Sequence, residues 1–201
     1  MNKSRLEAFS NGVLAIIITI MVLEIKVPHG SEWIELKPLI PKFISYLMSF
    51  LFIGIYWGNH HHLLHAVKQV SSGMMWANTN LLFWLSLVPF ATGWMGENYF
   101  APNTVVIYGI IQLISGLAYT FLQKVVEKNT HDLETLKKAI RNLNKKGTIS
   151  LIGYLLAILF AYITPIVSHI IFFAIAIIWI IPDRNIEKVL REEAGGKQHK
   201  G

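Results

Sequence analysis

The stretch VLAIIITIMVL, residues 13–23, decides the fold class, because ten of its eleven side chains are apolar and none is charged. Its flanks extend the apolar run to about residues 6–27, which is the length of helix that crosses a hydrocarbon core about 30 Å thick. The whole chain of 201 residues is 53% hydrophobic and 15% charged. Soluble domains carry about 25% charged residues. The sequence therefore predicts a membrane protein and excludes an ordinary soluble domain.

Apolar runs of similar character recur along the chain and predict an all-α, polytopic fold with six transmembrane helices. The predicted helices cover residues 6–27, 39–57, 74–95, 104–122, 149–163 and 166–181. Residues 1–183 are thus expected to form a single transmembrane unit with a hydrophilic loop at 123–147, followed by a charged tail at 184–201. Thr164 and Pro165 divide the last two runs, and a threonine cap followed by proline predicts a tight turn there.

The basic residues are distributed unevenly over the two sides of the predicted bundle. With the N-terminus inside, 15 of the 18 lysines and arginines lie on the cytoplasmic side. The positive-inside rule therefore predicts that both termini are cytoplasmic. The net charge of +6 follows from this topology, so the bilayer is the expected partner and no nucleic-acid partner is predicted.

Several kinds of chemistry are excluded by what the sequence lacks. The chain has no cysteine, which removes disulfides, thiolate metal sites and cysteine nucleophiles. It also lacks the motifs of phosphate-binding loops, serine hydrolases and zinc proteases, as well as the TVGYG filter that supplies backbone carbonyls to potassium ions. The serines of the apolar runs have no histidine or carboxylate beside them at matching depth. We therefore expect no enzyme and no cofactor.

A histidine cluster at residues 60–65 suggests one alternative function. His61 and His65 are four residues apart and share a helix face, which suits zinc, nickel or copper. This spacing supports the hypothesis of a divalent-metal transporter or a haem-binding protein. However, the stretch contains no carboxylate, so capping histidines and a polar-network role for His60 are the other interpretations.

One stripe of the first predicted helix combines a hydroxyl with apolar side chains at membrane depth. Ile16, Thr19, Ile20 and Leu23 share this stripe at 100° per residue. Two interpretations remain open on spacing alone, since the stripe is typical of helix packing and the threonine hydroxyl can bond its own backbone.

Three blocks of sequence resemble one known family. The segment RLEAFSNGVLAIIITIMVLEIKVP, residues 5–28, resembles the R-x-x-x-F-S-D signature and apolar helix of the endolysosomal TMEM-type potassium channels and their bacterial homologues. YWGNHHHLL, residues 56–64, and NLLFWLSLVPF, residues 80–90, are similar to the second and third helices of that family. The chain departs from the signature at Asn11, where the family usually has aspartate.

The resemblance implies a homotetrameric channel in a bacterial inner (plasma) membrane, with first helices that line a pore permeable to monovalent cations and favour potassium over sodium. Rings of Ile16, Thr19 and Leu23, with Ile20 as the alternative middle layer, would form the constriction. The signature residues would hold this helix in place by bonding to His60 and Asn80, unless they simply cap it at the membrane boundary. These signature residues are Arg5, Phe9, Ser10 and Asn11.

Overall fold

The computed structural model describes residues 2–65, 67, 69–128 and 133–180, without the side chains of residues 65 and 133–143. The predicted tail at 184–201 lies outside the described residues, as do positions 129–132 of the predicted loop. Within these ranges the chain forms helices and no strand, which confirms the all-α prediction. Three helical segments are long and apolar enough to cross a membrane, and their bounds are Lys3–Leu23, Trp33–Leu64 and Pro102–Lys128.

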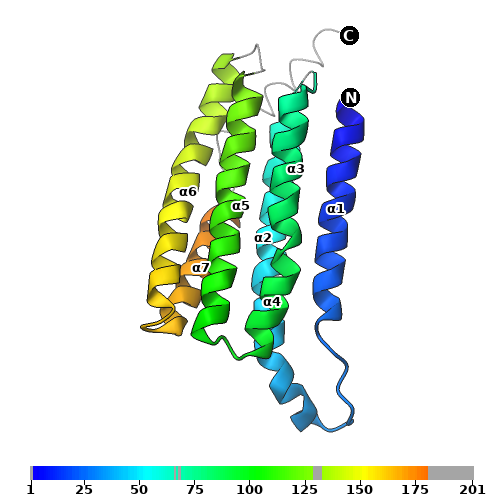
Figure 1. Cartoon of the computed structure of the whole chain (residues 1–201), viewed down its shortest axis with the longest axis vertical. Coiled ribbons are helices and arrows are strands. Elements are labelled where there is room, and N and C mark those ends of the chain that lie inside the picture. Colours follow the sequence, from blue (N-terminus) through cyan, green and yellow to red (C-terminus); the bar gives the residue numbers. More distant parts are fainter. Residues whose placement is uncertain (1, 66, 68, 129–132, 181–201) are drawn as a thin grey trace, which may run out of the picture.

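The described residues build six rods that run side by side (Figure 1). The first rod is α1 (Lys3–Leu23), and the second is α2 (Ile40–His65), preceded by the 3₁₀ helix η1 (Trp33–Leu39). The third is divided into α3 (Ser72–Ser86) and α4 (Val88–Glu97). The others are α5 (Pro102–Lys128), α6 (Leu133–Phe160) and α7 (Pro165–Ile180).

Capping side chains and prolines set the helix boundaries. The Ser71 hydroxyl accepts a hydrogen bond from the backbone N–H of Met74 at the start of α3 (3.2 Å), which satisfies one of the unpaired N–H groups there. The third rod breaks at Leu87, two residues before Pro89, because proline has no N–H to donate to the preceding turn. α7 begins at Pro165, and residues 161–164 connect it to α6.

The predicted hydrophilic loop is largely helical at both ends. α5 continues to Lys128 and α6 already begins at Leu133. The two long helices therefore extend beyond their apolar segments. A hydrogen bond joins them at this level, where Gln123 Nε2 donates to Asn144 Oδ1 at 2.8 Å.

Close contacts between helices depend on glycine at several positions. A Cβ atom at Gly96 of α4 would lie 2.5 Å from Ser45 Oγ of α2, and one at Gly109 of α5 would lie 2.7 Å from Ile158 Cγ1 of α6. Both distances are too short for carbon, so these helices pack closely only because the residue lacks a side chain. Small residues serve the same purpose in many membrane bundles.

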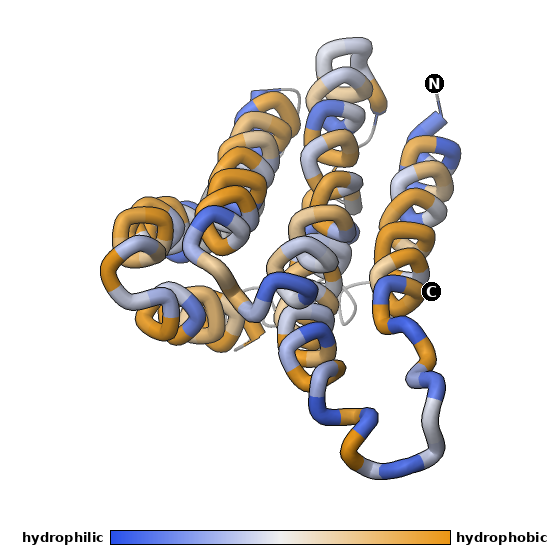
Figure 2. The backbone as a smooth tube through the Cα atoms, turned by 60° about the horizontal axis from the view of Figure 1, so that its bottom comes forward, coloured by the Kyte–Doolittle hydropathy of each residue, from blue (hydrophilic) through white to orange (hydrophobic). Residues whose placement is uncertain are grey.

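The first helix lies at one edge of the subunit. α1 packs against α2, α3 and α4, whereas α5, α6 and α7 pack together on the far side (Figure 1). Figure 2 shows that α1 is strongly apolar along most of its length. Because its neighbours lie on one side only, a broad apolar surface of α1 remains uncovered within a single chain.

Candidate functional site

The two faces of α1 differ in what they contact. The buried face consists of residues spaced three or four apart, and it packs on the bundle: Leu6, Ser10, Leu14, Ile17 and Met21. The opposite face includes every residue that the sequence predicted for the pore, since Ile16, Thr19, Ile20 and Leu23 are all exposed. Leu23, at the end of the helix, is 75% exposed.

An exposed apolar stripe at membrane depth contacts lipid, another chain or a pore. The predicted pore residues make no contribution to the buried core of their own subunit. Packing within the chain therefore does not require these residue types. Their side chains are free to contribute to a surface between subunits.

Thr19 is the only hydroxyl residue on this stripe of α1. Its Oγ1 donates back to its own helix, lying 2.9 Å from the carbonyl oxygen of Ile16 and 3.1 Å from that of Ala15. Because a hydroxyl has one hydrogen and two lone pairs, this bond leaves oxygen lone pairs directed away from the backbone. An exposed threonine held in this way presents a partial negative charge, which is the chemistry that a cation requires.

A buried chain of hydrogen bonds fixes the other face of α1 to two neighbouring helices. The Ser10 hydroxyl donates to the carbonyl oxygen of Leu6 (2.8 Å) and accepts from Asn78 Nδ2 of α3 (3.0 Å). Asn78 Oδ1 in turn lies 2.6 Å from His60 Nε2 of α2. An amide oxygen only accepts, so His60 donates from Nε2. Ser10 and Asn78 are fully buried, and His60 is 2% exposed.

The partner on α3 differs from the one expected. Asn78 forms the bonds predicted for Asn80, which is exposed. Two residues rotate a helix by about 200°, so the two asparagines face opposite directions. The apolar pattern of α3 indicates which asparagine is buried, because Asn78 shares its face with the buried Leu81, Leu82 and Leu85.

The other signature residues lie apart from this buried chain. Asn11 is exposed on α1, where its Oδ1 accepts a hydrogen bond from Trp57 Nε1 of α2 at 3.1 Å. Arg5 and Phe9 are exposed as well, and Arg5 forms no ion pair with a described residue. Ser10 and Asn11 thus tie α1 separately to α3 and α2.

The histidine cluster gives no support to a metal site. His61 stacks on Trp57 with ring centroids 6.3 Å apart, and it also contacts His62 edge to face. The side chain of His65 lies outside the described residues. Where side chains are described, no group of three or more histidines or carboxylates is close enough together to hold a metal ion.

Known proteins with similar sequences identify the family of this chain. Residues 5–89 match the family described as "Endosomal/lysosomal potassium channel TMEM175". A potassium channel of a Chryseobacterium species is 50% identical over 192 residues, which cover 96% of this chain and all of that protein. A potassium channel of Streptomyces collinus is 31% identical, with coverage of 82% of this chain and 85% of the relative. The chain belongs to the TMEM175 family.

A solved TMEM175 structure agrees with the fold. The crystal structure of a lysosomal potassium-selective channel TMEM175 homologue from Chamaesiphon minutus superposes with a TM-score of 0.79. The two sequences are 29% identical, and the match covers 89% of this chain and 96% of the other. As a member of the TMEM175 family, the chain is a membrane-embedded cation-channel protein and not an enzyme, and channel activity of this kind requires no cofactor. The interpretation as a divalent-metal transporter finds no support in these relatives.

Proposed function

We propose that this TMEM175 member is a potassium-permeable channel, favouring potassium over sodium, whose pore is lined by α1 from four identical subunits. In this proposal the bilayer is the inner (plasma) membrane, both termini are cytoplasmic, residues 1–183 form the channel subunit and residues 184–201 form a tail. The observation that carries the proposal is the exposed face of α1, on which Ile16, Thr19, Ile20 and Leu23 lie together. The names of the bacterial relatives support the choice of ion.

The pore chemistry follows from these side chains. Rings of isoleucine and leucine make a narrow apolar constriction, which closes to ions when water leaves it. A ring of Thr19 oxygens replaces part of the hydration shell that a cation loses in the constriction, which lowers the energetic cost of its passage. Potassium is larger than sodium and holds its water less tightly, so partial dehydration favours potassium.

The polar contacts of Ser10 and Asn11 position this constriction in our proposal. Hydrogen bonds from Asn78 Nδ2 to Ser10 Oγ and from Trp57 Nε1 to Asn11 Oδ1 tie α1 to α3 and α2. They fix the rotation of the helix about its own axis, which decides which side chains face the pore. Asn11 contributes an amide oxygen here, whereas the aspartate usual in the family would carry a charge.

The test is a reversal-potential measurement on purified protein in a planar bilayer, with potassium on one side and sodium on the other. We expect a potassium-favouring potential for the wild type. In Thr19→Ala the permeability ratio should fall about threefold, which corresponds to roughly 0.7 kcal/mol, because the ring oxygens are lost.

Thr79→Ala is the matched control for this prediction. Thr79 is an exposed threonine of α3 that also bonds its own helix, with Oγ1 donating to Met75 O at 2.9 Å. Its replacement should leave the ratio unchanged. Current that follows a pH gradient, but neither cation gradient, would replace potassium with protons as the conducted ion. An absence of current under all three gradients would overturn the channel proposal itself.

A further inference from the structure

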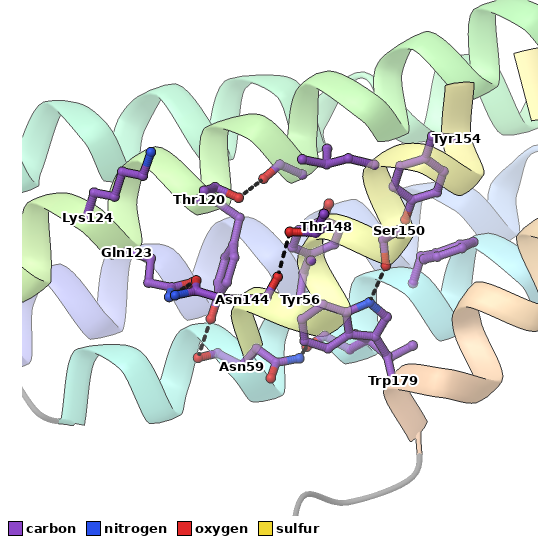
Figure 3. A pocket seen from close by; sticks show the side chains of 16 residues that line it. Tyr56, Asn59, Thr120, Gln123, Lys124, Asn144, Thr148, Ser150, Tyr154 and Trp179 are labelled. Atoms are coloured by element: carbon purple, nitrogen blue, oxygen red, sulfur yellow. Dashed lines mark hydrogen bonds between the residues drawn. The ribbon is translucent and has the colours of Figure 1, made fainter. Parts of the chain in front are cut away.

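A cavity of about 260 Å³ lies inside the subunit, between α2, α5, α6 and α7 (Figure 3). No residue of α1 lines it, so it is separate from the proposed pore. Its lining comes from the second half of α2, the second half of α5, the middle of α6 and the end of α7. The cavity therefore spans the level at which α5 passes from apolar residues to the polar Gln123 and Lys124.

Five of the sixteen residues that line the cavity are aromatic. Phe52, Tyr56, Tyr119, Tyr154 and Trp179 all line the cavity. Several are held in place by contacts with one another or with neighbouring side chains: Tyr56 and Tyr119 meet edge to face at 6.1 Å, and Trp179 Nε1 donates to Ser150 Oγ at 2.8 Å. Rigid aromatic walls are typical of sites for flat, ring-containing ligands.

Two of these tyrosines have hydroxyls without a protein partner. Tyr119 donates its hydroxyl hydrogen to the carbonyl oxygen of Asn59 at 3.2 Å. By contrast, no hydrogen bond joins the hydroxyl of Tyr56 or Tyr154 to any described residue, although both side chains are buried. Both residues line the cavity, and their hydroxyls are open to it and are not closed off in the core. A ligand in the cavity that accepts from these hydroxyls would give each of them a hydrogen-bond partner.

The rim of the cavity carries positive charge and amide groups. Lys124 is exposed at the rim and forms no ion pair with a described residue. Asn144 lies opposite it on α6, where its Oδ1 accepts from Gln123. Lys146 adds a second ammonium nearby, since its Nζ lies 5.9 Å from the centre of the Trp179 ring. Gln123 Nε2 also donates to the carboxylate of Glu127 at 3.2 Å, so two ammonium groups stand against one carboxylate among the side chains named here. The resulting positive charge attracts an anionic group.

Size limits the ligand further. A volume of 260 Å³ exceeds the roughly 150 Å³ of an engineered apolar cavity that binds benzene. The cavity thus has room for a single aromatic ring with two small substituents.

We propose that this cavity binds a single-ring aromatic monocarboxylate that also carries a ring hydroxyl or carbonyl, such as a hydroxybenzoate. The ring stacks among Tyr56, Tyr154 and Trp179, and the carboxylate faces Lys124 and Asn144. The ring oxygen accepts from the free tyrosine hydroxyls. The site is independent of ion conduction, so it is tested by binding.

The experiment titrates 3-fluoro-4-hydroxybenzoate with the purified full-length protein in detergent micelles and follows ¹⁹F line broadening, with empty micelles as the reference. We expect saturable binding to the wild type. Gly147→Phe should weaken it about tenfold or more, since Gly147 lines the cavity and a Cβ there meets open space. Gly147→Ala, which makes the same change to the backbone without the bulk, should bind as the wild type does. So should Ile152→Phe on the exposed side of α6, where Ile152 is 54% exposed.

Two further variants test the proposed contacts. Tyr154→Phe keeps the ring and removes one hydroxyl, so it should lose about fivefold in affinity for the hydroxybenzoate and none for fluorobenzoate, which lacks the ring hydroxyl. Lys124→Gln should weaken both acids and leave neutral fluorophenol unaffected. Three results would each overturn the proposal: no saturable binding to the wild type, equal binding by Gly147→Phe, or tighter binding of fluorophenol than of the acid.

Discussion

A Leu23→Cys channel treated with a trimethylammonium methanethiosulfonate reagent should lose at least about nine-tenths of its potassium current. Leu23 lies at the end of α1 on the proposed pore face and is 75% exposed. Four bound ammonium groups about 5 Å from the pore axis would repel a passing potassium ion by roughly 3–13 kcal/mol, depending on the effective dielectric constant. Even the lower figure slows conduction by roughly 100-fold, because 1.4 kcal/mol is a factor of ten.

The reagent can label only the introduced thiol, since the chain contains no native cysteine. Ile163→Cys is the matched control. Ile163 is 74% exposed, and it lies in the connection between α6 and α7, at the same end of the bundle as Leu23 (Figure 1). It should be labelled to the same extent without loss of current. Full labelling of Leu23→Cys, established by mass spectrometry, with undiminished current would remove Leu23 from the pore.

Replacement of Asn78 by leucine should have the largest effect on stability. Leucine has the same number of side-chain heavy atoms and the same branching as asparagine but accepts no hydrogen bond, so the Nε2 hydrogen of the buried His60 loses its acceptor and Ser10 loses a donor. We expect a loss of roughly 1–3 kcal/mol, the cost of an unpaired buried donor. The measurement is the midpoint of thermal unfolding of the purified protein in detergent.

Asn80→Leu supplies the control for this prediction. It makes the same chemical change two residues later, on the exposed side of α3, and should leave the midpoint almost unchanged. Equal destabilisation by the two variants would mean that the buried chain of hydrogen bonds contributes nothing specific. The Asn78→Leu channel should also have altered conduction, because α1 loses its hydrogen bond to α3.

The helical fold could be predicted from the sequence because long apolar runs leave few alternatives in a membrane. Backbone groups in lipid must bond within their own segment, so an apolar run of about 20 residues becomes a helix. Local details were harder to predict. The break at Leu87 depends on which neighbouring groups hydrogen-bond to the carbonyl that Pro89 leaves unpaired. The 3₁₀ helix before α2 depends on the path of the preceding loop.

The candidate site was predicted in part, and the reason is visible in single residues. Spacing on α1 correctly placed Ile16, Thr19, Ile20 and Leu23 on a shared face, since helical periodicity is a local property. The choice between Asn78 and Asn80 required knowing which face of α3 meets α1. The cavity was not predictable at all, because Tyr56 and Trp179 meet only after four helices have packed together.

The placement of the polar contacts of Ser10 and Asn11 has a mechanical consequence. Both lie in the first half of α1, while the buried contacts farther along are apolar ones from Leu14, Ile17 and Met21. Apolar contacts have no preferred direction, and Gly12 has no close neighbour of the kind that locks Gly109. A tilt of α1 about a point near Asn11 would therefore move the far end of the helix most. Leu23 lies about 18 Å from that point at 1.5 Å per residue, so a tilt of about 10° moves it roughly 3 Å.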